Sequence, residues 1–261
     1  IKRLLLFNLL FCRILFRTAA NKNFGVSGEK MADIEKNLKE IFSEISAGND
    51  RGEKIALLGA TKFVPTEKIN EAVAAGLEYI GENHAQEFRD KFAFYPPCEK
   101  HFIGTLQKNK LKYVVGKADV IDSVSNAEIA EAINEKAATL GIVQSVMLEI
   151  NAGDEKTKTG SSIDTAKALY KSIINLNHLK LIGIMAMLPA GKTDDELAYL
   201  CEKVRGFYEE IRLSSPDVKT LSMGMSGDYK TAIKHGSNMI RLGRAIFGER
   251  SQNITQEQTV T

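Results

Sequence analysis

The chain has 261 residues, of which 44% are hydrophobic and 26% are charged, and its formal net charge at pH 7 is +2. This is ordinary globular composition, and the nearly balanced charge gives no reason to expect nucleic acid as a partner. The three cysteines (Cys12, Cys98 and Cys201) are widely spaced and the four histidines show no metal-ligand spacing, so we expect no metal, no disulfide framework and a reducing, cytoplasmic location.

The first thirty residues differ from the rest of the chain. Residues 4–16 are apolar but are interrupted by polar residues and are too short to span a bilayer, so no membrane association is expected. Basic residues with no acid before Glu29 fit a targeting sequence, but we favour a misplaced gene start, with Met31 as the natural first residue. We therefore expect a non-core extension at 1–30, one barrel domain at 31–250 and a polar tail at 251–261.

From Ala32 onward, helix-like and strand-like hydrophobic patterns alternate regularly. The predicted strands are Ile55–Thr61, Tyr79–Glu82, His101–Gly104, Val120–Val124, Gln144–Asn151, Leu179–Ala186, Lys219–Met223 and Met239–Leu242. The predicted helices are Ala32–Ala47, Thr66–Ala75, Ala85–Phe92, Gln107–Val115, Ala127–Leu140, Ser162–Leu176, Asp194–Leu213 and Asp228–His235.

Eight alternations predict an α/β protein with a single (β/α)₈ TIM-type barrel, preceded by one extra helix. The chain length fits, since such barrels usually take about 250 residues. An open doubly wound sheet is the alternative, but it normally has fewer strands, and no Gly-x-Gly-x-x-Gly segment follows the first strand. About ten residues follow the barrel, so we expect no added β-domain.

Polar residues follow several of the predicted strands, at the end of a barrel where active sites lie. Lys62 follows the apolar first strand. Such surroundings lower the pKa of a lysine and leave its amine nucleophilic, although a surface lysine is the more frequent outcome of this pattern. Asn83 can place its amide over a ligand ring, but the pattern favours an N-cap of the helix that begins at Ala85. His101 begins the third strand, at the opposite end, so we expect a structural role.

Two glycine-bearing segments follow the last two strands, Ser222–Gly227 and Arg241–Gly248. Small residues there let backbone N–H groups close on a phosphate, and Arg244 adds positive charge. Together with Lys62, these segments predict pyridoxal 5′-phosphate (PLP) held as a Schiff base. Arg241 lies within an apolar strand, so its guanidinium needs a polar partner near the barrel mouth, and the ring nitrogen of such a cofactor would suit it.

Several motifs together resemble those of the PLP homeostasis proteins, also called proline synthetase co-transcribed homologues, which are single-domain relatives of the alanine racemase barrel. The resemblance covers about residues 31–250 and rests on Ala60–Lys62, Gly81–Asn83, Gln86-Glu87, His101–Gly104, Leu106–Lys110, Lys156–Gly160, Leu221–Ser226 and Arg241–Gly248.

The resemblance implies a role for individual residues. It implies that Lys62 forms the internal aldimine and that Arg241 faces the pyridine nitrogen. It implies that Ser226 and the pair Gly243-Arg244 hold the phosphate. We add three further residues to the predicted cofactor-binding set: Asn83, Ser222 and Met223. The polar loop that carries Lys156 and Lys158 is expected to lie over the site.

The sequence departs from this family at a few positions. The family commonly has Ser-Lys-Thr-Lys-Pro around the aldimine lysine, whereas this chain has Thr61-Lys62-Phe63-Val64-Pro65, so the second lysine is missing. His84 stands where a tyrosine is common. Gly227 stands where a polar residue is usual, which should loosen the phosphate segment slightly.

The resemblance implies a protein that buffers or delivers PLP with little or no turnover, as a monomer, with PLP-dependent enzymes in their apo form as recipients. An arginine at the ring nitrogen keeps that nitrogen unprotonated and makes the ring a weak electron sink. In the racemase relatives, the second base comes from the β-domain that is not expected here. The alternatives are a small PLP-dependent racemase or lyase with its acid–base group on the barrel, and a phosphosugar-binding barrel enzyme without PLP.

Overall fold

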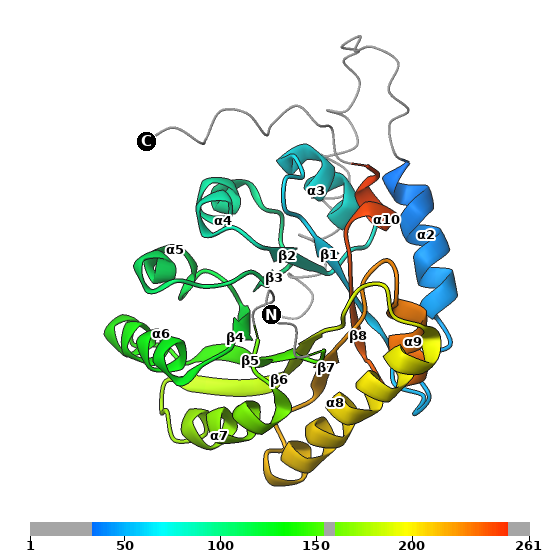
Figure 1. The fold of residues 1–261 in the computed structure, drawn as a ribbon. Coiled ribbons are helices and arrows are strands. Elements are labelled where there is room, and N and C mark those ends of the chain that lie inside the picture. Colours follow the sequence, from blue (N-terminus) through cyan, green and yellow to red (C-terminus); the bar gives the residue numbers. More distant parts are fainter. Residues whose placement is uncertain (1–32, 154–159, 250–261) are drawn as a thin grey trace, which may run out of the picture. The chain divides into compact units, whose positions relative to one another are not determined.

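The computed structural model describes residues 33–153 and 160–249. Within these residues, eight parallel strands pair in sequence order, and β8 pairs with β1 to close a barrel (Figure 1). The strands are β1 (Ala56–Ala60), β2 (Tyr79–Glu82), β3 (Glu99–Phe102), β4 (Val120–Val124), β5 (Gln144–Asn151), β6 (Leu179–Met187), β7 (Thr220–Ser222) and β8 (Met239–Leu242). The predicted (β/α)₈ barrel is confirmed.

Some sequence-based expectations concern other parts of the chain. The extension at 1–30, the tail at 251–261 and the loop residues Lys156 and Lys158 lie outside the described residues. These expectations therefore stay predictions.

Helices surround the barrel and present their apolar faces to it (Figure 1). They are α2 (Ile34–Ile45), α3 (Thr66–Ala74), α4 (Ala85–Lys91), α5 (Leu111–Val114), α6 (Ala127–Leu140), α7 (Ile163–Ile173), α8 (Asp194–Ser214), α9 (Tyr229–Lys234) and α10 (Arg244–Phe247). Side chains that accept a backbone N–H cap several of their N-termini, among them Asn126 before α6 and Thr193 before α8. In the described part of the chain, no helix has the length and apolar character needed to cross a membrane.

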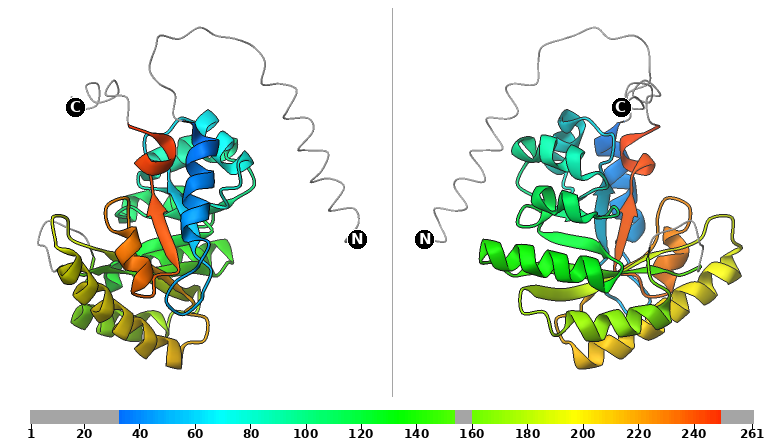
Figure 2. Two further views of the ribbon diagram at one scale, coloured as in Figure 1. Left: turned by 90° about the vertical axis from the view of Figure 1, so that its right-hand side faces the viewer. Right: turned by 60° about the vertical axis from the view of Figure 1, so that its left-hand side comes forward.

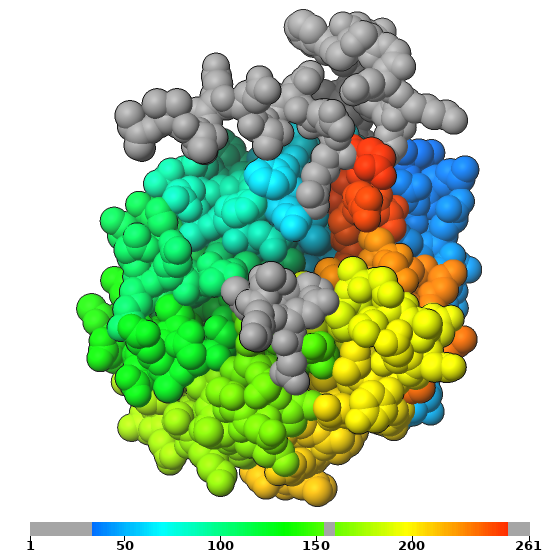
Figure 3. All heavy atoms as spheres, in the orientation of Figure 1, coloured from blue at the N-terminus to red at the C-terminus, as the bar shows by residue number. Residues whose placement is uncertain are grey.

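The extra helix α2 covers the outer face of β1 and β8, where the following helix α10 is only four residues long. Leu38 of α2 belongs to the same buried cluster as Leu57 of β1 and Leu242 of β8. The Asn37 side chain donates to the carbonyl of Ile246 at 3.0 Å. Figures 2 and 3 show blue α2 beside red α10. The helix therefore completes the outer layer at the point where the barrel closes.

The interior of the barrel is apolar in one layer and charged in the next. The apolar layer contains Leu58, Val120, Met147, Met185 and Met239. Because alternate residues of a strand face the same side, the residue two positions further on also points inward. On β4, β5 and β8 that residue is charged: Asp122, Glu149 and Arg241. All three are buried.

The structure differs from the predicted elements at three places, where the hydrophobic pattern of the sequence was weak or too short. β3 begins at Glu99, two residues before the predicted start, because Glu99 and Lys100 pair with β2 although both are polar. The helix predicted over Gln107–Val115 is a 3₁₀ turn, Lys108–Lys110, followed by the short α5. The turn α10 was not predicted, because four residues are too few to show a helical period.

Two glycines are required by close contacts near the C-terminal ends of the strands. A Cβ atom at Gly104 would lie 1.9 Å from the carbonyl oxygen of Asn83. Gly224 has φ +99°, and a Cβ there would lie 2.7 Å from the Cα of Tyr229. Gly104 therefore lets the segment after β3 approach the segment after β2. Gly224 lets the segment after β7 approach α9.

Candidate functional site

Lys62 and Asn83 lie at the same end of two neighbouring strands. Ala60 of β1 pairs with Gly81 of β2, and each predicted site residue lies two positions further along its strand direction. Leu58 belongs to the apolar layer inside the barrel, and Lys62 lies in the turn that follows β1, just beyond the end of the strand. Lys62 is half-buried. The structure therefore places this lysine and this amide together at the C-terminal mouth.

Asn83 is not the N-cap of α4, so this sequence-based preference was wrong. The cap position of α4 is His84, and no side chain caps the helix there. Within the described residues, the buried Oδ1 of Asn83 has no hydrogen-bond partner. A buried amide oxygen without a partner is costly, and it is suited to a ligand that supplies one.

The predicted phosphate segments follow β7 and β8, the two strands that precede β1 around the closed barrel. Ser226 lies exposed in a turn just before α9, while the N–H of Met225 donates to Asp228 Oδ1 at 2.5 Å. Gly243 is the N-cap of α10, so the N–H groups of Arg244 and Ala245 have no acceptor within that helix. The side chain of Arg244 is 64% exposed. Together, the serine hydroxyl, these amides and the guanidinium offer donors for a small anion.

Arg241 is 4% exposed and binds the ends of two other strands. Its Nη1 donates to the carbonyl of Ser222 (2.9 Å) and to Ser222 Oγ (2.8 Å). Its Nη2 donates to the carbonyl of Ala186 at 2.9 Å. Burial lowers the pKa of Arg241, against the attraction of Asp122. The polar partner expected for this buried arginine is thus, at least in part, the protein itself.

Ser222 and Met223 are fully buried. Ser222 Oγ accepts from Arg241, and the N–H of Met223 contacts the carbonyl of Met239 (3.1 Å) and Ser237 Oγ (3.2 Å). The polar groups of these two predicted site residues therefore bind neighbouring parts of the protein, and they fix the segment that leads to Ser226.

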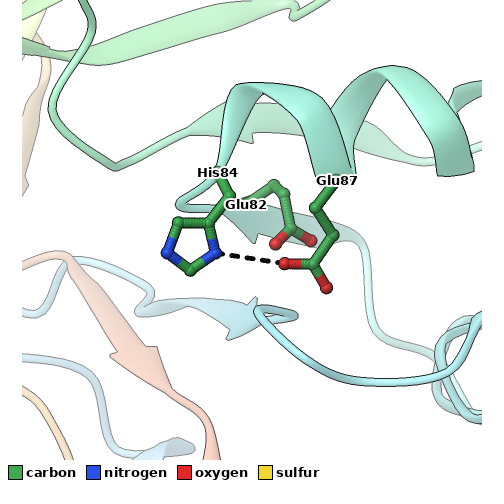
Figure 4. Close-up of side chains that lie close together, drawn as sticks. All are labelled: Glu82, His84 and Glu87. Atoms are coloured by element: carbon green, nitrogen blue, oxygen red, sulfur yellow. Dashed lines mark hydrogen bonds and ion pairs between the residues drawn. The ribbon is translucent and has the colours of Figure 1, made fainter. Parts of the chain in front are cut away.

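Sequence reasoning missed a charged cluster on β2 and α4, which includes Glu82 and Glu87 (Figure 4). It lies close to Lys62, because Glu87 and Lys91 contact the backbone of Phe63 and Thr61. Glu82 is buried and accepts from Thr61 Oγ1 at 2.7 Å. Burial raises the pKa of Glu82 to about 7, against the attraction of Lys91. Burial by itself would raise the pKa of Glu87 as well. Hydrogen bonds, first of all from Lys91, outweigh this effect and hold the pKa of Glu87 below its usual value. The available signal was the spacing of Glu87 and Lys91, which are four residues apart on one helix.

Glu82, His84 and Glu87 have ligand atoms within 4.8 Å of one another, as a metal site would require (Figure 4). However, the ammonium group of Lys91 contacts Glu87 and lies 3.6 Å from Glu82 Oε2. The cluster therefore already contains a cation that contacts both carboxylates. His84 Nδ1 lies 3.2 Å from Glu87 Oε2 and its ring packs 4.9 Å from that of Phe63. The arrangement suits a structural ion pair better than a metal ion.

His101 lies at the other end of the barrel, as predicted. It lines a cavity of about 220 Å³ with residues that begin strands, including Tyr79, Glu99 and Met239. Its Nδ1 lies 2.8 Å from Asp122 Oδ1. Burial lowers the pKa of His101, but the charges and hydrogen bonds of Asp122 and Glu99 together outweigh burial and raise the pKa to about 9. This buried pair gives His101 a structural partner.

The predicted site residues come from four strands that are neighbours in the barrel, in the order β7, β8, β1, β2. The cluster offers one amine, one buried amide oxygen without a partner within the described residues, and donors for an anion. These groups fit a small aromatic aldehyde that carries a phosphate, because each of its polar ends would meet a suitable partner.

Comparisons with known proteins find similar proteins over most of the chain. Residues 62–251 match the family model described as "Alanine racemase, N-terminal domain". The pyridoxal phosphate homeostasis protein of Aquifex aeolicus is 39% identical over 204 residues, which cover 77% of this chain and 90% of that protein. The protein of the same name from Pasteurella multocida is 37% identical over 231 residues, which cover 83% of this chain and 97% of that protein.

A solved structure of PipY from Synechococcus elongatus, with PLP bound, has the same fold. It is 28% identical to this chain with a TM-score of 0.73, and the match covers 83% of this chain and 100% of PipY.

Proposed function

Because the chain belongs to the family of pyridoxal phosphate homeostasis proteins, we propose that it binds PLP and buffers or delivers this cofactor, with little or no turnover of its own. The observation that carries the proposal is the meeting of Lys62, the Asn83 amide and two glycine-bearing segments at one end of the barrel. The bound PLP in the structure of PipY supports the choice of ligand.

Each predicted residue has a role in this proposal. Lys62 Nζ holds the aldehyde carbon of PLP, and the Asn83 amide contacts the ring. Ser226, Gly243 and Arg244 hold the phosphate, with the N–H groups at the start of α10 as donors. When bound, PLP supplies an aldehyde that a lysine amine captures reversibly and a ring that can accept electrons.

Three further residues shape the floor of the proposed site. Arg241 faces the ring nitrogen, and Ser222 orients its guanidinium through the two hydrogen bonds to Nη1. Met223 supports the segment before Ser226. The recipients would be PLP-dependent enzymes in their apo form, and the protein would act as a monomer in the cytoplasm.

Reduction and peptide mapping test the attachment point. Purified protein incubated with PLP should absorb visible light, and borohydride reduction should leave the label on Lys62. Lys62→Ala should show neither the absorbance nor the label. A label on another lysine, or no absorbance in the wild type, would contradict the proposal. Rapid interconversion of amino-acid enantiomers by the loaded wild type would favour a racemase instead.

A second variant tests the phosphate end. Ser226→Ala removes one hydroxyl donor to a dianion, and hydrogen bonds to charged groups are worth about 1.5–3 kcal/mol. The affinity for PLP should therefore fall about tenfold or more, whereas the affinity for pyridoxal, which lacks the phosphate, should change little. Equal losses for both ligands would show that Ser226 does not contact the phosphate.

A further inference from the structure

The two peptide groups on either side of Lys62 are both held by side chains of α4. The carbonyl of Thr61, in the peptide before Lys62, accepts from Lys91 Nζ at 3.2 Å. The N–H of Phe63, in the peptide after Lys62, donates to Glu87 Oε1 at 2.7 Å. Glu87 and Lys91 also form an ion pair with each other. One ion pair therefore contacts the backbone both before and after the lysine.

The backbone held in this way is strained. Among the described residues, Phe63 is the one non-glycine residue with a positive φ, at 60°. The left-handed region is unfavourable for a residue with a Cβ, and a bulky residue adopts it only when its surroundings hold it there. The hydrogen bond from Phe63 to Glu87 and the contact of its ring with His84 are such restraints.

The ion pair is shielded from water, so its contacts are stronger than those of an exposed pair. The side chains of Glu87 and Lys91 are 18% and 15% exposed. Glu82 adds a third restraint, because it accepts from Thr61 Oγ1 at 2.7 Å while it lies 3.6 Å from Lys91 Nζ. The backbone at Lys62 thus has little freedom to turn.

We propose that Glu87 and Lys91 act as positioning residues, which clamp the backbone at Lys62 and thereby direct its amine into the barrel mouth. The inference rests on the proposed function, in which this amine takes up PLP. A lysine side chain is long and flexible, so fixing its backbone removes part of the freedom that binding would otherwise have to restrict. The clamp would favour capture of any aldehyde at Lys62, with or without a phosphate.

Hydrogen exchange of the protein without added ligand tests the clamp directly. Glu87→Ala should speed exchange of the Phe63 amide about tenfold or more, because it removes a charged acceptor. Lys91→Met should have a smaller effect in the same direction. Glu87→Gln keeps a carbonyl acceptor and should restore part of the protection. The matched control is Glu35→Ala, which breaks the exposed pair of Glu35 and Lys39 with the same spacing on α2 and should leave this amide unchanged.

Loading experiments then test the positioning role. Glu87→Ala and Lys91→Met should slow the appearance of visible absorbance with PLP and with pyridoxal alike, whereas Ser226→Ala should affect only PLP. Unchanged exchange at Phe63 would overturn the clamp, and faster exchange with unchanged loading would overturn its positioning role. If wild-type protein captures no PLP, the proposed function fails, but the exchange measurement still decides whether the clamp exists. Should Glu87→Ala not fold, Glu87→Gln and Lys91→Arg give the same comparison with smaller expected effects.

Discussion

At the scale of single residues, His101 shows how the barrel interior tolerates charge. Its imidazole is buried, which by itself would favour the neutral form, yet the adjacent Asp122 carboxylate keeps it protonated at neutral pH. Glu99, on the same strand, lies 3.2 Å from Nε2 and adds to this effect. The pair is therefore neutral as a whole and can be buried without an unbalanced charge.

This pair makes the stability of the protein depend on pH. The pKa of His101 rises from 6.5 to about 9 on folding, so its contribution is complete below pH 6.5 and is lost as the pH rises through 9. The loss should be roughly 3 kcal/mol, because one pKa unit corresponds to about 1.36 kcal/mol. Urea unfolding between pH 6.5 and 9.5 measures it. The double variant His101→Gln, Asp122→Asn should lose this slope, and an equal slope in both proteins would contradict the prediction.

At the scale of the elements, Gly104 links β3 to the position of Asn83. Gly104→Ala places a methyl group 1.9 Å from the Asn83 carbonyl, so the two segments must move apart. We expect a lower free energy of unfolding, by about 1–3 kcal/mol as for other overpacked sites, and weaker PLP binding because Asn83 shifts. Urea unfolding and PLP titration measure the two effects.

Gly141→Ala is a suitable comparison for this variant. Gly141 lies between α6 and β5 with φ +65°, which is unfavourable for alanine, but no atom lies within 4 Å of a Cβ added there. It should lower stability without changing the affinity for PLP. If both glycine variants lose affinity equally, the effect of Gly104 is not specific to Asn83.

The sequence predicted the elements well where hydrophobic periodicity was strong. β2, β4, β5 and β8 have the predicted bounds, and α6 does as well. The failures have physical causes: β3 begins with polar residues that only their pairing with β2 reveals, and α10 is too short to show a period.

For the site, sequence patterns placed Lys62 and the glycine-bearing segments at strand ends, but they could not identify the contacts around them. The preference for Asn83 as a helix cap was wrong because the chain turns one residue later, at His84. The clamp from α4 was missed because a pair four residues apart on a helix is usually only a solvated surface pair. Its closeness to Lys62 depends on how α4 packs against β2 and on the pairing of β2 with β1, which a single sequence does not reveal.

At the scale of the whole molecule, Arg241 joins three strands of the barrel. From β8 it donates to the ends of both β7 and β6. Arg241→Met should lower the free energy of unfolding by about 3 kcal/mol or more, because it leaves buried carbonyls without donors and removes the charge that faces Asp122. Urea unfolding measures the loss.

Arg244→Met is the control for this variant. It makes the same replacement three residues later, where the side chain is 64% exposed, and should change stability by no more than about 0.5 kcal/mol. Similar effects of the two variants would mean that the buried contacts of Arg241 contribute little to the barrel.

The pairing of β1 with β8 also affects when the proposed site can form during protein synthesis. Gly59 pairs with Leu242, so the two sides of the proposed site are about 180 residues apart in the sequence. At about 5–20 residues per second, synthesis delivers the last strand roughly 10–40 s after the first. Throughout that interval a growing chain carries Lys62 without the segments proposed to hold the phosphate. Unfinished chains on the ribosome would therefore lack the contacts proposed for the phosphate, and full affinity for PLP would be reached only when the final strand has docked.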